Sequence, residues 1–307
     1  MTIPSIDRGT ADGGAANRRS VDAYPTRHLS GVLRVERRDP VVWADASEGP
    51  MAPDELRDYR RDGFVTVDPL LEAGEVASLR AELARLCDDP AVRADERTII
   101  EPDSEAVRSI FEIHRISPLL RELVADPRLV GRARQILGSD VYIHQSRANL
   151  KPGFDGSGFY WHSDFETWHA EDGMPAMRAV SISIALTENH VHNGALMIMP
   201  GSHHTFVACP GETPHGHYRT SLRRQEIGTP DPDSLTELAD RHGIAVLTGP
   251  AGSATVFDSN CMHGSAENIT PYPRSNLFIV YNSVHNALTD PYAAPEPRPD
   301  FIAARGR

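Results

Sequence analysis

The chain of 307 residues is poor in cysteine, with only Cys87, Cys209 and Cys261. An odd number of cysteines without Cys-x-x-Cys spacing argues against a disulfide framework, so we expect a reducing, cytoplasmic environment. Long apolar runs are lacking too, because none approaches the roughly 18 residues that a membrane-spanning helix needs. The first residues also lack the apolar core of a signal peptide, and nothing in the sequence predicts a membrane or secreted protein.

Basic residues are the next scarce class. The chain has 31 Lys and Arg against 43 Asp and Glu, a net charge of −12 at pH 7, and no dense basic run. This balance argues against nucleic acid or an anionic membrane as the main partner. The helical zinc-hydrolase motif His-Glu-x-x-His is likewise absent. What remains is the ordinary composition of a globular protein, 40% hydrophobic and 24% charged.

Helical and strand patterns divide the chain into two parts. Residues 1–20 are polar and Gly/Ala-rich, which predicts a disordered tail, and residues 21–50 are expected to form an irregular arm. Apolar spacing then predicts helices at 54–61, 71–87 and 106–137, the last one broken before Pro118 and Pro127. A short strand is predicted at 63–68.

Beyond Gly138 the pattern is that of strands. They are predicted at 141–151, 159–164, 178–186, 195–199, 244–247, 253–257 and 275–283, with a helix at 231–242 and a long loop at 202–220. The proline-rich tail from Asp290 is expected to be irregular. Helices followed by many short strands predict an α+β fold whose β part is a sandwich or jelly roll. We expect one catalytic domain over residues 21–307.

His162 and Asp164, in Phe159-Tyr-Trp-His-Ser-Asp164, are the first candidate metal ligands. Residues two apart on a strand point to the same side, so an imidazole and a carboxylate would converge. That pair is part of the 2-His-1-carboxylate set of non-haem Fe(II) oxygenases. In a chain with 14 His and 43 acidic residues the pattern is at chance frequency, and it recurs at His169-Ala-Glu171. We interpret this second pair as loop polarity at the entrance of a pocket.

A third ligand has to come from a distant segment, and His263, beside Gly264, is the best candidate. The alternative for His263 is a buried histidine bonded to backbone. Arg274, on the next predicted strand, could clamp the distal carboxylate of a 2-oxoacid, with Ser265 adding a hydroxyl. A surface salt bridge is the alternative for Arg274. The loop histidines are expected to be solvated; they are His203, His204, His215 and His217.

The ordered set of His-x-Asp, a distant His and a following Arg resembles the Fe(II)/2-oxoglutarate dioxygenases of the phytanoyl-CoA hydroxylase superfamily, and the ectoine hydroxylases in particular. Four stretches carry the resemblance: Asp22-Ala-Tyr-Pro-Thr-Arg27, Gln145-Ser-Arg-Ala-Asn-Leu-Lys151-Pro-Gly-Phe154, Trp161-His-Ser-Asp-Phe-Glu-Thr-Trp-His-Ala-Glu-Asp-Gly-Met-Pro175 and Asp258-Ser-Asn-Cys-Met-His-Gly-Ser265. Together they span almost the whole chain from about residue 20.

The resemblance implies a double-stranded β-helix (a jelly-roll, cupin-like core) with an N-terminal helical layer. It implies Fe(II) held by His162, Asp164 and His263. It implies 2-oxoglutarate bound by Lys151, Ser265 and Arg274, with O₂ as co-substrate. Ectoine would be contacted by Gln145, Thr167, Trp168, Phe257 and Arg298.

The implied reaction is hydroxylation of L-ectoine to 5-hydroxyectoine, with release of succinate and CO₂, in compatible-solute biosynthesis by a homodimer. The Asp at position 164 counts against a halogenase. Two rivals stay open: a related hydroxylase of another small zwitterion such as proline, and a non-enzymatic β-barrel binding protein. For Trp168 and Phe257 the alternative to substrate contact is packing in the core.

Overall fold

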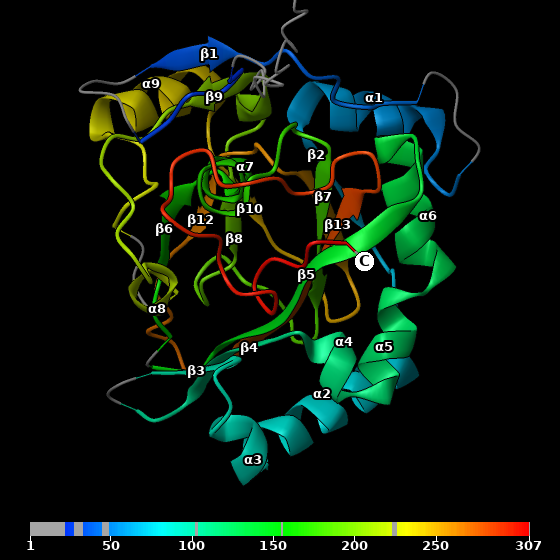
Figure 1. Cartoon of the computed structure of the whole chain (residues 1–307). Coiled ribbons are helices and arrows are strands. Elements are labelled where there is room, and N and C mark those ends of the chain that lie inside the picture. The colour runs from blue at the N-terminus through cyan, green and yellow to red at the C-terminus, as the bar shows by residue number, and fades with distance from the viewer. Residues whose placement is uncertain are drawn as a thin grey trace, which may run out of the picture.

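The computed structural model describes residues 22–27, 33–44, 49–101, 104–154, 156–222 and 226–306, so the tail predicted at 1–20 lies outside the described residues. Within the described part, seven strands form an antiparallel sheet in the order β2-β11-β7-β13-β5-β4-β3 (Figure 1). They are β2 (Phe64–Val67), β3 (Thr98–Ile100), β4 (Val107–Phe111), β5 (Val141–Lys151), β7 (Ala179–Ala185), β11 (Ala254–Asp258) and β13 (Arg274–Ser283). This large sheet is the frame of the molecule.

A smaller sheet in the order β10-β8-β12-β6 faces the large one. Its strands are β6 (Phe159–His162), β8 (Leu196–Ile198), β10 (Ala245–Leu247) and β12 (His263–Ser265). Leu196 and Ile198 from the small sheet pack with Phe257 and Phe278 from the large sheet, which closes the space between them. With the helices described next, this arrangement confirms the predicted α+β jelly roll with an N-terminal helical layer.

Helices cover the outer face of the large sheet (Figure 1). The N-terminal ones are α1 (Pro53–Asp62), α2 (Ala73–Asp88), α3 (Pro90–Arg93), α4 (Ile113–Ile116), α5 (Pro118–Val124) and α6 (Pro127–Leu137). Ser117 and Asp126 cap α5 and α6 by accepting from Leu120 N and Arg128 N, and a proline follows each cap, so both predicted helix breaks are confirmed.

The alternation predicted around β7 is confirmed. Val180, Ile182 and Ile184 are fully buried in one core with the leucines of the helices. Ser181 and Ser183 lie on the other face of the strand, toward the space between the sheets, where Ser183 accepts a hydrogen bond from Asn276. Strand β7 therefore packs an apolar face against the helices and turns a polar face toward the space between the sheets.

Three regions differ from the prediction. The helix expected from residue 106 is wrong at β4, because Val107–Phe111 extends the large sheet beside β5 and buries all five residues. The arm at 21–50 contains β1 (Arg34–Glu36), which pairs with β9 (Thr205–Val207) inside the expected loop 202–220. That loop also contains η2 (Ser202–His204) and α8 (Tyr218–Ser221), and α9 (Pro232–His242) follows as predicted. Each of these strands needed a distant partner that local patterning does not reveal.

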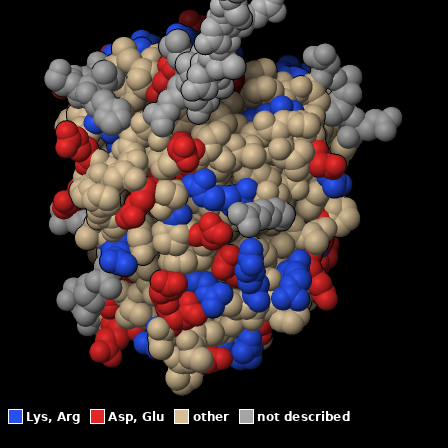
Figure 2. Space-filling view, in the orientation of Figure 1, with Lys and Arg blue, Asp and Glu red and all other residues tan. Residues whose placement is uncertain are grey.

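The surface carries both signs of charge. Figure 2 shows acidic and basic side chains of the described residues interspersed over one face. Among the described residues, no helix has the length and apolar content required to cross a bilayer.

Gly173 provides a test of the backbone geometry. It has φ +78°, and a Cβ there would overlap the carbonyl oxygens of Thr289 and Asp290. We expect Gly173→Ala to lower the free energy of unfolding by about 2 kcal/mol or more. A Cβ added at the exposed Gly74, near the start of α2, would meet no atom within 4 Å. Gly74→Ala should therefore raise the free energy of unfolding by about 0.5–1 kcal/mol. Denaturant unfolding measures both, and equal effects would contradict the account.

Candidate active site

Two histidines meet across a strand pair. β6 and β12 run antiparallel with His162 directly opposite His263, and their imidazole centroids are 4.3 Å apart. Each Nδ1–H donates to a backbone carbonyl, His162 to Tyr160 at 2.7 Å and His263 to Cys261 at 3.0 Å. Both Nε2 atoms are therefore left with a free lone pair on the same side. Burial, followed by the neighbouring His162, lowers the pKa of His263 to about 4, so it is neutral at pH 7 as a metal ligand must be.

Asp164 supplies a carboxylate, although not from a strand as predicted. β6 ends at His162, Ser163 caps the next turn, and Asp164 is the first residue of α7 (Asp164–Thr167). Its oxygens lie 3.7 Å from His162 Nε2 and 3.9 Å from His263 Nε2. Burial raises the pKa of Asp164, but the nearby His263, His162 and Arg147 outweigh burial and keep it below the ordinary value.

The three side chains fit a metal ion. One ligand atom from each of His162, Asp164 and His263 lies within 4.8 Å of the other two. Two neutral imidazole nitrogens and one ionised carboxylate are the donor set typical of non-haem Fe(II). The structure thus brings the three predicted residues together, although Asp164 arrives from a helix start and not from a strand.

Two cavities meet at this cluster, and His162 lines both. The first, here called the Arg274 cavity, reaches into the space between the sheets past Ser265 and Arg274. The second, the Trp168 cavity, opens on the other side toward Gln145 and Trp168. A metal at the cluster would therefore be reached from two directions.

Arg274 lies at the end of the first cavity with 2% exposure. Its guanidinium donates to Gly194 O at 2.8 Å and to Asn276 Oδ1 at 3.2 Å, and it forms no ion pair with a described carboxylate. Burial, then the positive charge of Arg147, lowers the pKa of Arg274 to about 10, so it stays cationic at pH 7. A buried cation without a counter-ion indicates a site for an anionic ligand.

Lys151 sits beside this cavity without lining it. Paired with Arg274 across β5 and β13, it donates from Nζ to Ser265 Oγ at 2.9 Å and to Ala266 O at 2.5 Å. Burial, then the charges of Arg274 and Arg108, lowers the pKa of Lys151 to about 6. The predicted trio Lys151, Ser265 and Arg274 is thus gathered in one place.

Arg147 is a site residue that the sequence reasoning missed. Its side chain lines both cavities beside His162, and its buried Nε has no hydrogen-bond partner in the part of the chain that the structure describes. The guanidinium lies over the Phe278 ring at 5.0 Å, and burial lowers its pKa. Its position in the Gln145–Lys151 stretch, two residues from Gln145 on the same strand face, was the available signal.

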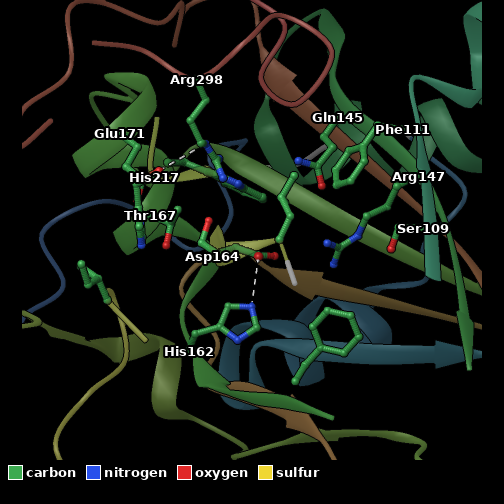
Figure 3. A pocket seen from close by; sticks show the side chains of 15 residues that line it. Ser109, Phe111, Gln145, Arg147, His162, Asp164, Thr167, Glu171, His217 and Arg298 are labelled. Carbon is green, nitrogen blue, oxygen red and sulfur yellow. Dashed lines mark hydrogen bonds and ion pairs between the residues drawn. The ribbon is translucent and has the colours of Figure 1, made fainter. Parts of the chain in front are cut away.

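Figure 3 shows the Trp168 cavity with Asp164 and His162 at its floor. Gln145, Thr167 and Trp168, which were predicted to contact the same substrate, all line this cavity. Gln145 donates through Nε2 to Ile302 O at 2.8 Å, which leaves its Oε1 as an acceptor. Trp168 is 3% exposed and packs edge-on against the buried His144 ring, 5.0 Å between centroids.

Arg298 reaches this cavity from the C-terminal tail, which is irregular as expected, and its own side chain is buried. Its Nε and Nη2 form a bidentate ion pair with Asp172, at 2.8 and 2.5 Å. Nη1 has no partner among the described residues. Phe257, by contrast, lies in the core edge-on to His263, 5.2 Å between centroids, and does not line either cavity.

The expectations for the other histidines were wrong in part. His203 and His217 are buried rather than solvated, whereas His204 and His215 are exposed. His169 and Glu171 lie in the π-helical turn η1 (Trp168–Asp172) and are buried, not in a loop. Glu171 lines the Trp168 cavity and pairs with His217 Nδ1 at 3.1 Å. Burial raises the pKa of Glu171, but His217, Arg298 and Arg27 lower it to about 2.

Metal analysis tests the assigned cluster without turnover. Anaerobically reconstituted protein should hold about one Fe(II) per chain, and His162→Ala or Asp164→Ala should hold almost none because each removes one of three ligands. His285→Ala, which removes an exposed histidine, is the matched control and should keep its iron. Full iron occupancy in Asp164→Ala would contradict the assignment.

Comparison with known proteins agrees with this geometry. A model of the family described as Phytanoyl-CoA dioxygenase (PhyH) matches residues 59–276. Ectoine dioxygenase from Streptomyces anulatus is 62% identical over 285 residues, covering 92% of this chain and 96% of that protein. The crystal structure of EctD from S. alaskensis with 2-oxoglutarate and 5-hydroxyectoine has a TM-score of 0.85 and 47% identity, covering 93% of this chain and 95% of that one. The structure of that protein with bound Fe has a TM-score of 0.83. The chain therefore belongs to the phytanoyl-CoA dioxygenase (PhyH) family and, within it, to the ectoine dioxygenases.

Proposed function

We propose that this protein hydroxylates L-ectoine to 5-hydroxyectoine, with O₂ and 2-oxoglutarate as co-substrates and Fe(II) as the metal. The observation that carries the proposal is the His162–Asp164–His263 cluster between a cationic cavity and an aromatic one. The relatives named above support the substrate. One oxygen atom goes to ectoine and the other to succinate, and CO₂ is released.

His162, Asp164 and His263 would hold the iron. Bound Fe(II) supplies the redox chemistry that couples decarboxylation of 2-oxoglutarate to oxidation of a C–H bond. The protein's own part is to orient both rings through their Nδ1–H donors, which leaves the two Nε2 atoms as the ligand atoms. Ser181 Oγ, 3.4 Å from Asp164 Oδ2, helps to fix the carboxylate.

The Arg274 cavity would take 2-oxoglutarate, a dianion. Arg274 can pair with the distal carboxylate through the guanidinium edge that Gly194 and Asn276 leave free. Ser265 adds a hydroxyl that Lys151 holds in place. Arg147, between the two cavities, adds a second cation, which interacts with the charge of Asp164 but forms no ion pair with a described carboxylate.

The Trp168 cavity would take ectoine, a delocalised amidinium ring that carries a carboxylate. The indole face of Trp168 attracts such a cation by about 0.5–2 kcal/mol. Gln145 Oε1 can accept from a ring N–H, because Ile302 already takes up its amide donor. Arg298 Nη1 is free for the carboxylate while Asp172 fixes the rest of the guanidinium. Thr167 offers a hydroxyl on the same wall.

We also propose the wider setting. Residues 21–307 would act as one catalytic unit, since β1 pairs with β9 and the tail contacts Gln145 through Ile302 O. Three free cysteines support a reducing cytoplasm, where hydroxyectoine would serve as a compatible solute under osmotic or heat stress.

An exposed apolar surface of Phe154, Ile269 and Tyr272 supports a homodimer. Sedimentation at micromolar concentration tests the dimer, and a single-chain mass would contradict it.

Product analysis tests the reaction. Anaerobically prepared Fe(II) protein, given 2-oxoglutarate, O₂ and ectoine, should form hydroxyectoine and succinate in equal amounts, as measured by mass spectrometry. Proline supplied in place of ectoine should give little product. Efficient hydroxylation of proline with none of ectoine would reject the substrate assignment and leave the reaction class standing.

Trp168→Ala tests the aromatic wall. We expect the KM for ectoine to rise about tenfold, since roughly 1.4 kcal/mol of cation–π and contact energy is lost. The KM for 2-oxoglutarate should stay unchanged. Trp43→Ala is the matched control, because Trp43 also stacks with a cation, Arg178 at 4.4 Å, far from either cavity wall. An unchanged KM for ectoine in Trp168→Ala would rule out the wall.

A further inference from the structure

The N-terminal stretch Asp22–Arg27 is packed residue by residue against the turn that follows the metal ligand Asp164. Asp22 Oδ1 lies 3.0 Å from His169 Nε2, and the Tyr24 ring packs edge-on against Phe165, 5.3 Å between centroids. Thr26 Oγ1 donates to Glu166 Oε1 at 2.7 Å. This hexapeptide lies outside residues 59–276, which the family model matches.

Arg27 makes the strongest of these contacts. Its side chain has 0% exposure and a left-handed backbone, φ 60°. Nε and Nη2 donate to the two oxygens of Glu166, at 3.0 and 2.8 Å, and Nη1 donates to Glu171. Nη1 also donates to Thr213 Oγ1 at 2.9 Å. One guanidinium thus joins both ends of the turn to the segment that follows β9.

The two ion pairs of Arg27 balance two buried negative charges. Glu166 and Glu171 are both buried, and Arg27 lies directly between them. Without Arg27, Glu166 would keep only the Thr26 hydroxyl as a partner from the arm, and Glu171 would keep His217 and the more distant Arg298. Removing one member of a buried ion pair in this way is strongly unfavourable. Burial lowers the pKa of Arg27, but the charges of Glu166 and Glu171 outweigh burial and raise it above its ordinary value.

The turn that Arg27 holds carries the chemistry of the site. α7 begins at Asp164, and Thr167, Trp168 and Glu171 line the Trp168 cavity over the next two turns. A displacement of this turn would move the substrate wall relative to the metal cluster. Arg27 itself does not line the cavity, so any effect on ectoine must act through these residues.

We propose that Arg27 is a positioning residue, which sets the α7–η1 turn so that Trp168 and Glu171 receive ectoine at the correct distance from the metal cluster. The hexapeptide Asp22–Arg27 thereby supports one wall of the substrate cavity from behind, without lining it. This inference rests on the proposed hydroxylation of ectoine.

The variants Arg27→Met and Arg27→Lys test it, with Arg34→Met as matched control. Arg34 lies on the same arm but forms an exposed ion pair with Glu237, 35% and 46% exposed. The readouts are the KM for ectoine, the KM for 2-oxoglutarate, the ratio of hydroxyectoine to succinate, and the thermal midpoint.

We expect Arg27→Met to raise the KM for ectoine about tenfold or more and to lower the product ratio below that of the wild type, because misplaced substrate lets 2-oxoglutarate be consumed without hydroxylation. The KM for 2-oxoglutarate should change little. Arg27→Lys, which keeps the charge but not the fork of donors, should be intermediate. Arg34→Met should match the wild type. A lower thermal midpoint with normal ectoine KM and product ratio would overturn the inference.

Two further measurements distinguish a folding defect of the variant, or a failure of the proposed function, from a failure of this inference. Should Arg27→Met fail to fold, Thr26→Val removes only the hydroxyl bonded to Glu166 and Cys209, and it should shift the product ratio in the same direction. An unchanged ratio would then reject the inference. Should the wild type not hydroxylate ectoine, the proposed function fails by itself. Near-UV circular dichroism then reports on Trp168 packing, which should change in folded Arg27 variants and not in Arg34→Met.

Discussion

The antiparallel pairing of β6 with β12 is the constraint on which the site depends. Its register sets His162 opposite His263, and the strand spacing brings the two rings to 4.3 Å between centroids. A slip of one residue would turn one imidazole to the opposite face of the small sheet. Because β12 also pairs with β8, it has a neighbour on each side and cannot move freely. The chain ends β6 immediately afterwards and turns into α7, so Asp164 arrives at the same point.

Charge is divided around this point in a way that suits two different ligands. On one side lie Arg274 and Arg147, which form no ion pair with a described carboxylate. On the other side Glu171 and Arg298 line the Trp168 cavity, while Glu166 and Asp172 behind it are paired with the guanidiniums of Arg27 and Arg298. The first side favours a dianion, and the second, with a carboxylate and a guanidinium on its wall, favours a ligand that carries both a positive and a negative charge. A 2-oxoacid and a cyclic amidinium meet these two demands.

Much of the fold could be predicted from local patterns. The alternation of Val180, Ile182 and Ile184 against Ser181 and Ser183 fixed the inner and outer faces of β7, because one face packs on helices and the other borders the site. The segment Val107–Phe111 was not recognised as a strand, because its apolar spacing also fits a helix and does not reveal its pairing with β5 and with the short strand β3. The same limit hid β1 and β9, which pair across the chain.

The residues of the site could likewise be predicted only in part. Residue types and their order were enough to gather His162, Asp164, His263 and Arg274, although Asp164 reaches its place from a helix start and not from a strand. Arg147 was missed and Glu171 was interpreted as loop polarity at a pocket entrance, because an arginine on a strand and a His-x-Glu pair are common in exposed positions. Only their burial and their neighbours distinguish them. Arg27 was noticed as part of a motif, but its two carboxylate partners lie about 140 residues away in the sequence.

The central claim is that the cluster of His162, Asp164 and His263 directs both atoms of dioxygen, one to ectoine and one to 2-oxoglutarate. The most direct measurement supplies dioxygen enriched in the heavy isotope to the Fe(II) protein with both substrates, and follows the label by mass spectrometry. The account predicts one heavy atom in hydroxyectoine and one in succinate. A hydroxyl oxygen derived wholly from water, or labelled succinate formed without hydroxyectoine, would contradict it.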